Sequence, residues 1–216
     1  ESLKRLEYRG YDSAGVAGIA GGKIERRRAE GKIRALEEVL AAEPLTATVG
    51  IGHTRWATHG APSVRNAHPH SQGRVTLVHN GIIENFAELR ERLQHAGHIF
   101  TSDTDTEVIA ALLDSELGAG RAPVEALKAT LDQLTGAYAL AVLIEGDPRL
   151  RPAFHQSPRL IGIEEIRGGI VAHVHVRLAI RVQVGDQHPQ SAAVWSQRPV
   201  GCRVNERAVL LVQEQR

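Results

Sequence analysis

Residues 1 to about 150 predict an α+β domain, and three observations support this. Short β-favouring segments alternate with turn residues, such as the glycine pair at 21–22. Other segments have apolar residues at helical spacing, with capping residues at their starts. Residues 137–144 form a nearly continuous apolar run, typical of a strand buried on both faces. At 216 residues the chain can bury one sizeable core, or one domain with an appendage.

The first part of the chain predicts a helix end, a hairpin and a second helix. Leu3 and Leu6 stand at helical spacing among charged residues, and apolar residues of the same period recur before Pro44. Between them the glycine pair separates two β-favouring segments. The expected elements are a helix ending near 8, strands at 16–20 and 23–28, and a helix at 32–42.

The rest of the domain predicts alternating strands and helices. Asn85 and Glu88 resemble a capping box, and Pro123 suits the first position of a helix. The acidic residues of 102–107 favour the start of another helix, because they complement its dipole. The expected elements are strands at 48–52, 74–79 and 137–144, and helices from 85 to about 96, from 102 onward and from 123 to about 133.

The stretch 53–60 concentrates recognition chemistry in the sequence His-Thr-Arg-Trp-Ala-Thr-His-Gly. It follows a short strand and precedes a turn signal, so its side chains are expected to leave the strand end and line a loop. Arg55 and Thr58 could hold the α-carboxylate of a free amino acid, and a carboxylate such as Asp105 could hold its α-ammonium. The alternative is a surface arginine and a helix-capping aspartate.

A second candidate is the pair Asn80 and Gly81 at the end of a predicted strand. Together they could present a side-chain amide and a backbone N–H to one oxygen, as an oxyanion hole requires. The alternative is an ordinary turn, since Asn-Gly is among the commonest turn pairs.

Five histidines lie close together in the sequence. No Cys or His-Glu-x-x-His pattern accompanies them, so hydrogen bonds that hold loop geometry are expected, with no metal and no other cofactor. Trp56 could line a pocket or fill core, and its polar neighbours favour the pocket rim. The histidines are His53, His59, His68, His70 and His79.

Composition narrows the class of protein. The net charge is +1 with both signs interspersed, which favours neither nucleic acid nor a membrane surface as a partner. No apolar run reaches the roughly 18 residues of a membrane span. The single Cys202 cannot form an internal disulfide, which suits the cytoplasm. The sequence contains no methionine, so we expect a fragment of a longer protein.

From about residue 151 the composition changes. Residues 151–216 contain no Lys, Thr or Tyr, and Asp186 is their only aspartate. Segment 169–184 could form strands, but no motif follows residue 150. We therefore expect a domain at 1–150 and an unmatched tail at 151–216. The tail is either a divergent segment or the product of a shifted reading frame, and we favour a shifted reading frame.

Five motifs occur together and in order, and they resemble the glutaminase domain of the glucosamine-6-phosphate synthase family, the glutamine:fructose-6-phosphate aminotransferases (isomerizing). The resemblance implies an N-terminal-nucleophile (Ntn) hydrolase fold, a four-layer α/β/β/α sandwich of two antiparallel sheets between helix layers. Its first strand would be missing from this chain. The motifs lie at 6–15, 53–60, 66–70, 78–85 and 102–107.

The resemblance also implies a role for each matched position. Arg55, Thr58 and Asp105 match the groups that hold the α-carboxylate and α-ammonium of glutamine, and Trp56 and His59 lie beside them. Asn80 and Gly81 match the oxyanion hole. Arg9 and Gly10 match a loop near the nucleophile.

In this family an N-terminal cysteine thiol attacks the glutamine amide, and the ammonia passes to a sugar-isomerase module that makes glucosamine 6-phosphate from fructose 6-phosphate. The resemblance implies a homodimer. The matching cysteine would precede Glu1, and Cys202 lies in the unmatched tail. We therefore expect this chain to bind glutamine weakly and not to hydrolyse it. The alternative is a non-catalytic glutamine-binding or interaction module derived from the family.

Overall fold

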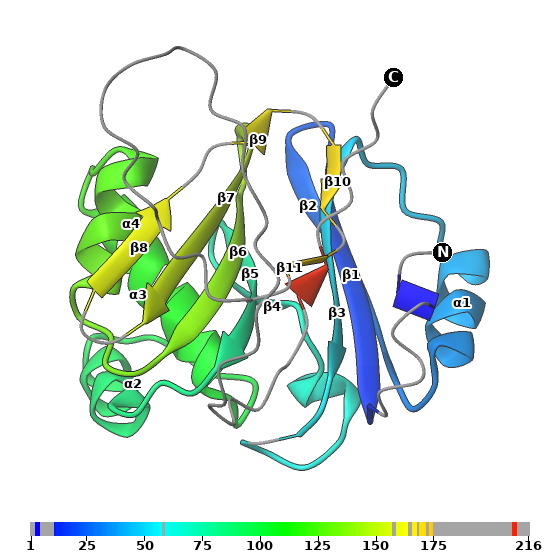
Figure 1. Ribbon diagram of the computed structural model, residues 1–216, viewed down its shortest axis with the longest axis horizontal. Coiled ribbons are helices and arrows are strands. Elements are labelled where there is room, and N and C mark those ends of the chain that lie inside the picture. The colour runs from blue at the N-terminus through cyan, green and yellow to red at the C-terminus, as the bar shows by residue number, and fades with distance from the viewer. Residues whose placement is uncertain are drawn as a thin grey trace, which may run out of the picture.

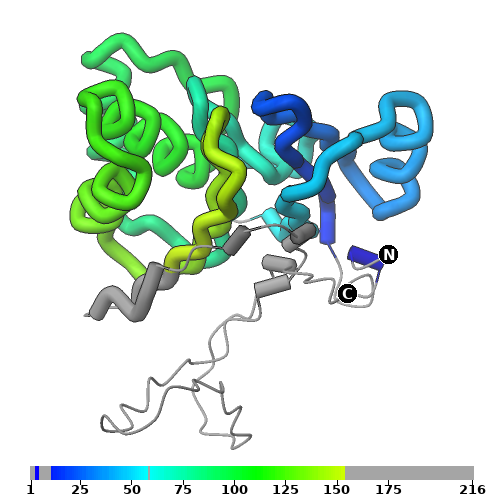
Figure 2. The backbone as a smooth tube through the Cα atoms, turned by 90° about the horizontal axis from the view of Figure 1, so that it is seen from above, coloured from blue at the N-terminus to red at the C-terminus, as the bar shows by residue number. Residues whose placement is uncertain are grey.

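The computed structural model describes residues 3–4, 11–57 and 59–156 and a few short strands between 159 and 210, with side chains described as far as residue 153. Two β-sheets pack face to face, with α1 outside one sheet and α2, α3 and α4 outside the other (Figure 1). The view from above shows the same order of layers (Figure 2). The α/β/β/α sandwich expected from the resemblance is confirmed.

The first sheet is built on a three-stranded antiparallel core, in which β1 lies between β2 and β3. Short strands from beyond residue 168 extend it on the other side of β3: β12 runs antiparallel to β3 and β10 runs parallel to it. The strands are β1 (Ser13–Ala20), β2 (Lys23–Glu30), β3 (Val49–Arg55), β10 (Gly169–Val171), β11 (His173–Val174) and β12 (Val209–Leu210).

The second sheet is antiparallel, in the order β4-β5-β6-β7-β8, with β9 paired to β7. Its strand β7 crosses residue 150, where the domain boundary was expected, and Leu150 and Ala153 are fully buried. The strands are β4 (His70–Gln72), β5 (Val75–Gly81), β6 (Tyr138–Ile144), β7 (Asp147–Gln156), β8 (Arg159–Ile163) and β9 (Ile166–Arg167).

The helices cover the outer faces of both sheets. In α3, ten of fourteen residues are buried, because this helix contacts the second sheet as well as α2 and α4. Pro123 occupies the start of α4, as predicted. The helices are α1 (Ile33–Ala42), α2 (Phe86–His95), α3 (Asp105–Gly118) and α4 (Pro123–Leu131), with a 3₁₀ turn at Val64–Asn66.

Strand β6 shows why residues 137–144 are apolar throughout. Leu140 and Val142 belong to the core between the second sheet and its helices, whereas Ala141 and Leu143 belong to the core between the two sheets. Alternate side chains of a strand point to opposite faces, and here both faces are covered. The predicted strand with two buried faces is confirmed.

Two local predictions were wrong in detail, and one strand was missed. Strand β3 continues through His53, Thr54 and Arg55, because each of these residues pairs with β1. Asn85 makes no capping bond in α2; its side chain instead donates to the Gln133 carbonyl and accepts from the Thr135 N–H. The short strand β4 was not predicted.

Other predictions lie wholly or largely outside the described residues. These are the helix ending near residue 8 and most of the tail. In the expected strand region 169–184, β10 and β11 fall among the described residues.

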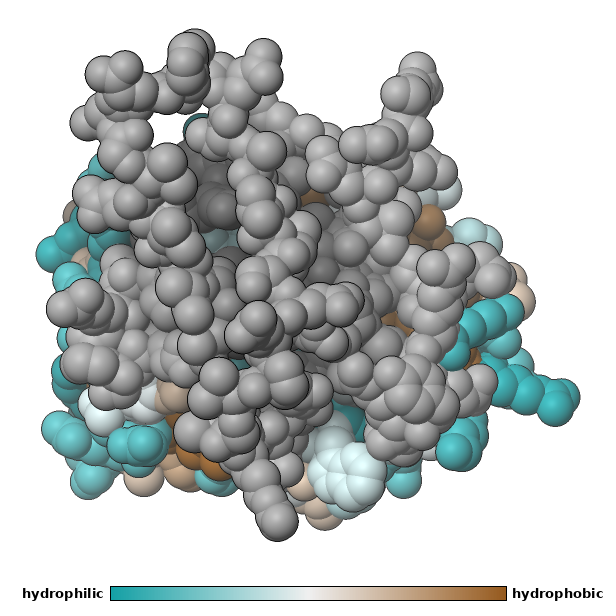
Figure 3. Space-filling model, viewed as in Figure 1, coloured by the Kyte–Doolittle hydropathy of each residue, from teal (hydrophilic) through white to brown (hydrophobic). Residues whose placement is uncertain are grey.

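On the face shown in Figure 3, hydrophilic described residues lie along the left and right margins, with smaller hydrophobic areas beside them. Among the described residues, no helix has the length and apolar character needed to cross a membrane.

Candidate functional site

A polar pocket lies where β3 and β5, from opposite sheets, come close to the first turn of α3. The pocket is narrow, with a cavity volume of about 20 Å³. The predicted residues that line it are Arg55, Trp56, His59, Asn80, Gly81 and Asp105, joined by His53, His68, His79, Thr104 and Thr106. Thr58, Arg9 and Gly10 lie outside the described residues.

Arg55 is the last residue of β3 and is only 3% exposed. Its Nη2 donates to the carbonyl oxygens of His59, at 2.5 Å, and Gly60, at 3.0 Å. Its Nη1 lies 3.8 Å from Oδ1 of Asp12, whose other oxygen accepts the Ala57 N–H at 2.5 Å. Arg55 is therefore not a surface arginine, because it is buried and binds the backbone of His59 and Gly60 from inside.

Trp56 follows Arg55 and leaves the strand toward solvent. It lines the pocket, yet 58% of its surface is exposed. The structure therefore places this indole at the rim and not in the core.

Asp105 is the first residue of α3, and the cap of that helix is its neighbour Thr104, which accepts the Glu107 N–H. The Asp105 carboxylate lies 3.7 Å from His79 Nδ1 and 3.9 Å from His59 Nδ1. Burial raises its pKa, but His79, the Ile83 N–H and His59 lower the pKa more, to about 2. Asp105 is therefore an ionised group in the pocket at neutral pH.

Asn80 and Gly81 are the last two residues of β5 and pair with Ala139 and Tyr138 of β6. They do not form the turn that the alternative interpretation required. Gly81 has φ +128°, and a Cβ there would lie 2.3 Å from the Ala137 carbonyl oxygen. Only glycine fits this position without strain.

The side chain of Asn80 is fixed from the opposite sheet. Its Oδ1 lies 2.8 Å from His53 Nε2, and both residues are buried. Because an amide oxygen can only accept, His53 must donate through Nε2.

Further imidazoles pack beside this pair. The His68 ring lies 4.3 Å from the His53 ring and 5.0 Å from the His70 ring. Thr106 Oγ1 lies 2.9 Å from His68 Nε2 and 3.2 Å from His79 Nδ1. The predicted role of the histidines in hydrogen bonding is confirmed for these residues. No group of three potential metal ligands occurs among the described side chains.

Burial and neighbouring charges keep two of these histidines neutral. Burial lowers the pKa of His68 well below its usual value, and His53 and His70 lower it further. Burial, followed by the charge of Arg28, lowers the pKa of His70 to about 3. His68, which lines the pocket, and His70, whose ring packs against it, are therefore neutral hydrogen-bonding groups at physiological pH.

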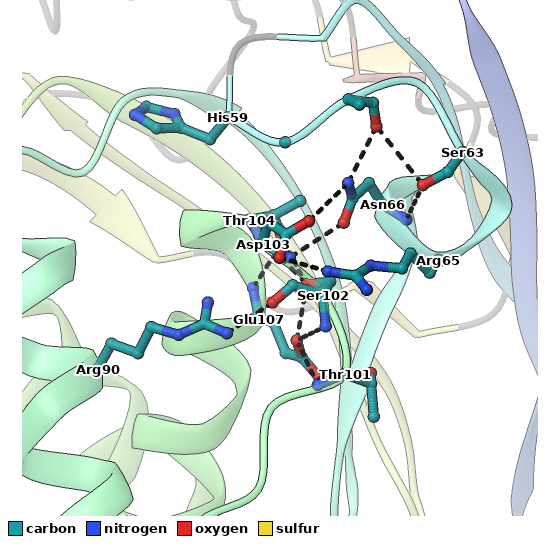
Figure 4. A network of polar contacts seen from close by, with 12 residues as sticks. His59, Ser63, Arg65, Asn66, Arg90, Thr101, Ser102, Asp103, Thr104 and Glu107 are labelled. Atoms are coloured by element: carbon teal, nitrogen blue, oxygen red, sulfur yellow. Dashed lines mark hydrogen bonds and ion pairs between the residues drawn. The ribbon is translucent and has the colours of Figure 1, made fainter.

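Sequence reasoning missed the residue that anchors the start of α3. Glu107 accepts hydrogen bonds from the backbone N–H groups and hydroxyls of Thr101 and Ser102 (Figure 4). Thr104 and Glu107 form the Thr-x-x-Glu pattern of a capping box, which could have revealed this. Glu107 reaches back to Thr101 and Ser102, which precede the helix, and so sets the position of Asp105.

The comparisons with known proteins agree on one family. Residues 53–153 match the model of the glutamine amidotransferase domain. The glutamine–fructose-6-phosphate aminotransferase (isomerizing) of Caulobacter vibrioides is 73% identical over 163 residues, which is 75% of this chain and 27% of that protein. The enzyme of the same name from Bradyrhizobium diazoefficiens is 58% identical over 160 residues, which is 74% of this chain and 26% of that protein.

Solved structures show the same fold. A glutamine phosphoribosylpyrophosphate amidotransferase from B. subtilis superposes with a TM-score of 0.58 at 24% identity, over 80% of this chain and 42% of that one. A structure described as the allosteric regulatory enzyme of purine biosynthesis gives a TM-score of 0.61 at 25% identity, with the same coverage. The chain spans about a quarter of the length of the sequence relatives it matches.

Proposed function

Residues 53–153 of this chain belong to the glutamine amidotransferase domain family, and from this premise we propose that the pocket between β3, β5 and α3 binds glutamine for release of its amide nitrogen. One observation carries the proposal: Arg55, Asp105 and Asn80, from three different elements, line a single pocket. A cation, a carboxylate and an amide are the groups that would bind glutamine and stabilise the charge formed when its side-chain amide is attacked.

The charges of the pocket suit a zwitterion. Among the described lining residues, Arg55 is the only permanent cation and Asp105 the only carboxylate. No ion pair joins them to each other: Asp12 lies near Arg55, and the two histidines lie near Asp105. Arg55 would attract the α-carboxylate of glutamine, and Asp105 would accept hydrogen bonds from its α-ammonium group.

Asn80 and Gly81 would act at the other end of the substrate. Attack on the side-chain amide places negative charge on its oxygen, and an N–H pair at the end of β5 would stabilise that charge. Gly81 lines the pocket at the end of β5, so its backbone would lie close to a bound ligand.

The described residues would supply binding and charge stabilisation but no thiol. The only cysteine of this chain, Cys202, lies outside both the family match and the described residues. We therefore propose that these 216 residues bind glutamine without hydrolysing it. A non-catalytic glutamine-binding module would give the same result in this test. The two interpretations differ in whether a nucleophilic cysteine acts together with this domain in the longer protein.

We extend the proposal to the longer protein, because the sequence relatives are named as glutamine–fructose-6-phosphate aminotransferases. There the released ammonia would convert fructose 6-phosphate to glucosamine 6-phosphate on a sugar-isomerase module, in a cytoplasmic homodimer. The support is the 73% identity to an enzyme whose name states this aminotransfer, over a quarter of its length.

A binding experiment tests the proposal. Titration of the purified chain with glutamine, followed by calorimetry or amide NMR, is expected to show saturable binding that asparagine does not reproduce. Incubation with glutamine should release no glutamate. Absence of glutamine binding by a folded chain would refute the binding proposal, and glutamate release that is lost in Asn80→Ala would refute the lack of hydrolysis.

A further inference from the structure

We propose that His53 is a positioning residue of the glutamine site, because its Nε2–H fixes which end of the Asn80 amide faces the substrate. The inference rests on the proposed function of the pocket. It concerns a residue of β3 that the motif comparison left without a role.

The bond between His53 and Asn80 joins the two sheets. His53 lies in the first sheet and Asn80 in the second, and their side chains meet at 2.8 Å between Nε2 and Oδ1. His53 is 3% exposed and Asn80 6% exposed, so water does not compete for this bond. The bond crosses the gap between the sheets at the point where the pocket forms.

The Asn80 side-chain amide has two possible orientations. The oxygen and nitrogen of a side-chain amide differ little in shape and are opposite in hydrogen-bonding character. With a proton on His53 Nε2, the Asn80 oxygen turns to His53 and the NH₂ group serves as the donor for the substrate oxygen. With the proton on Nδ1 alone, Nε2 becomes an acceptor, the amide turns over, and an oxygen faces the substrate oxygen instead.

Packing around the His53 imidazole restricts its position. The His68 ring packs on the His53 ring at 4.3 Å with a tilt of 33°, and His68 itself is held by Thr106 Oγ1 at 2.9 Å. On the strand, Gly15 is paired with His53, and a Cβ on Gly15 would lie 2.2 Å from the His68 carbonyl oxygen. The histidine ring therefore has little freedom to rotate away from Asn80.

The bond is specific in its chemistry as well as its position. Replacement of His53 by Gln keeps an N–H donor close to the place of Nε2, whereas replacement by Asn puts the donor near the place of Nδ1, out of reach of Asn80. The pair His53→Gln and His53→Asn is thus a matched test of similar polarity, and the proposal predicts opposite results for its two members.

The experiment measures binding of two ligands to the full chain. Norvaline has the α-carboxylate and α-ammonium of glutamine but no side-chain carbonyl. His53→Asn is expected to weaken glutamine binding about tenfold and leave norvaline binding unchanged, while His53→Gln retains glutamine binding. Equal weakening of both ligands, or equal loss in both variants, would show a merely structural role and overturn the proposal.

A measurement on the ligand-free protein keeps the two proposals separate. Long-range ¹⁵N–¹H spectra are expected to show His53 protonated at Nε2, and the Asn80 NH₂ signals should move in His53→Asn and stay near their original place in His53→Gln. Protonation of His53 at Nδ1 alone would overturn the positioning role, and so would Asn80 signals that stay unchanged in both variants. If these spectra agree and glutamine still fails to bind, the proposed function fails and the positioning of Asn80 stands.

Discussion

The Ile83 N–H donates to the Asp105 carboxylate at 3.1 Å, and this bond joins the segment after β5 to the first turn of α3. Ile83 is fully buried, so the bond is shielded from solvent. The carboxylate that would bind an ammonium group is thereby fixed relative to Asn80 and Gly81, which precede Ile83 in the chain.

Replacement of Asp105 by Asn tests its role as the anionic group of the pocket. The variant keeps the size of the side chain and removes its charge, so we expect glutamine binding to weaken by about 2 kcal/mol or more, roughly thirtyfold. Calorimetric titration measures the change. Asp132→Asn, at an exposed site after α4, should bind glutamine like the parent chain. Unchanged affinity in Asp105→Asn would remove Asp105 from the site.

Stability should fall as pH falls from 6.5 toward 5. His68 and His70 have pKa values below 6.5 in the fold, about 3 for His70, so the unfolded chain takes up protons that the folded chain excludes. Each such histidine contributes a slope of about 1.4 kcal/mol per pH unit, and the two together about 3 kcal/mol over this range. Carboxylates with lowered pKa values, such as Asp105, add to this loss only below about pH 5.

Urea denaturation at several pH values measures this slope. His70→Gln should reduce it by about half, whereas His95→Gln, at an exposed position in α2, should leave it unchanged. A stability that is constant between pH 6.5 and 5 would contradict neutral burial of both histidines.

Gly81→Ala should be strongly destabilising. The φ of +128° is strained for alanine, and the new Cβ would lie 2.3 Å from a backbone oxygen, so we expect a loss of at least about 3 kcal/mol in the free energy of unfolding. Gly97→Ala is the matched control, because φ is +92° there and no atom lies within 4 Å. It should cost about 1 kcal/mol. Thermal and urea unfolding compare the two, and equal losses would show that the contact with Ala137 does not matter.

Glu107→Gln should loosen the start of α3. The amide replaces one accepting oxygen by a donor that faces the N–H groups and hydroxyls of Thr101 and Ser102, so we expect a loss of about 3 kcal/mol. Glu91→Gln, exposed on α2, should change stability by less than about 0.5 kcal/mol. If the two variants unfold alike in urea, the Glu107 network does not stabilise the fold.

The sequence by itself determined the helices and strands in which neighbouring residues favour the same secondary structure. The apolar run of β6, the helix at 33–42 and the proline at the start of α4 follow from periodicity and propensity, which depend on residues a few positions apart. It also determined which residue types could bind a free amino acid. The order of the layers came from the family resemblance, because local pattern does not specify how sheets stack.

Only the tertiary structure decided what Asn80 does. Its local sequence favours a turn, but pairing with β6 keeps it in a strand, since the ladder offers hydrogen bonds that a turn would leave unmade. Its contact with His53, 27 positions away, exists because two sheets pack face to face and bring their strand ends together. A pattern of period two shows that a side chain points inward, and packing alone decides which side chain it meets.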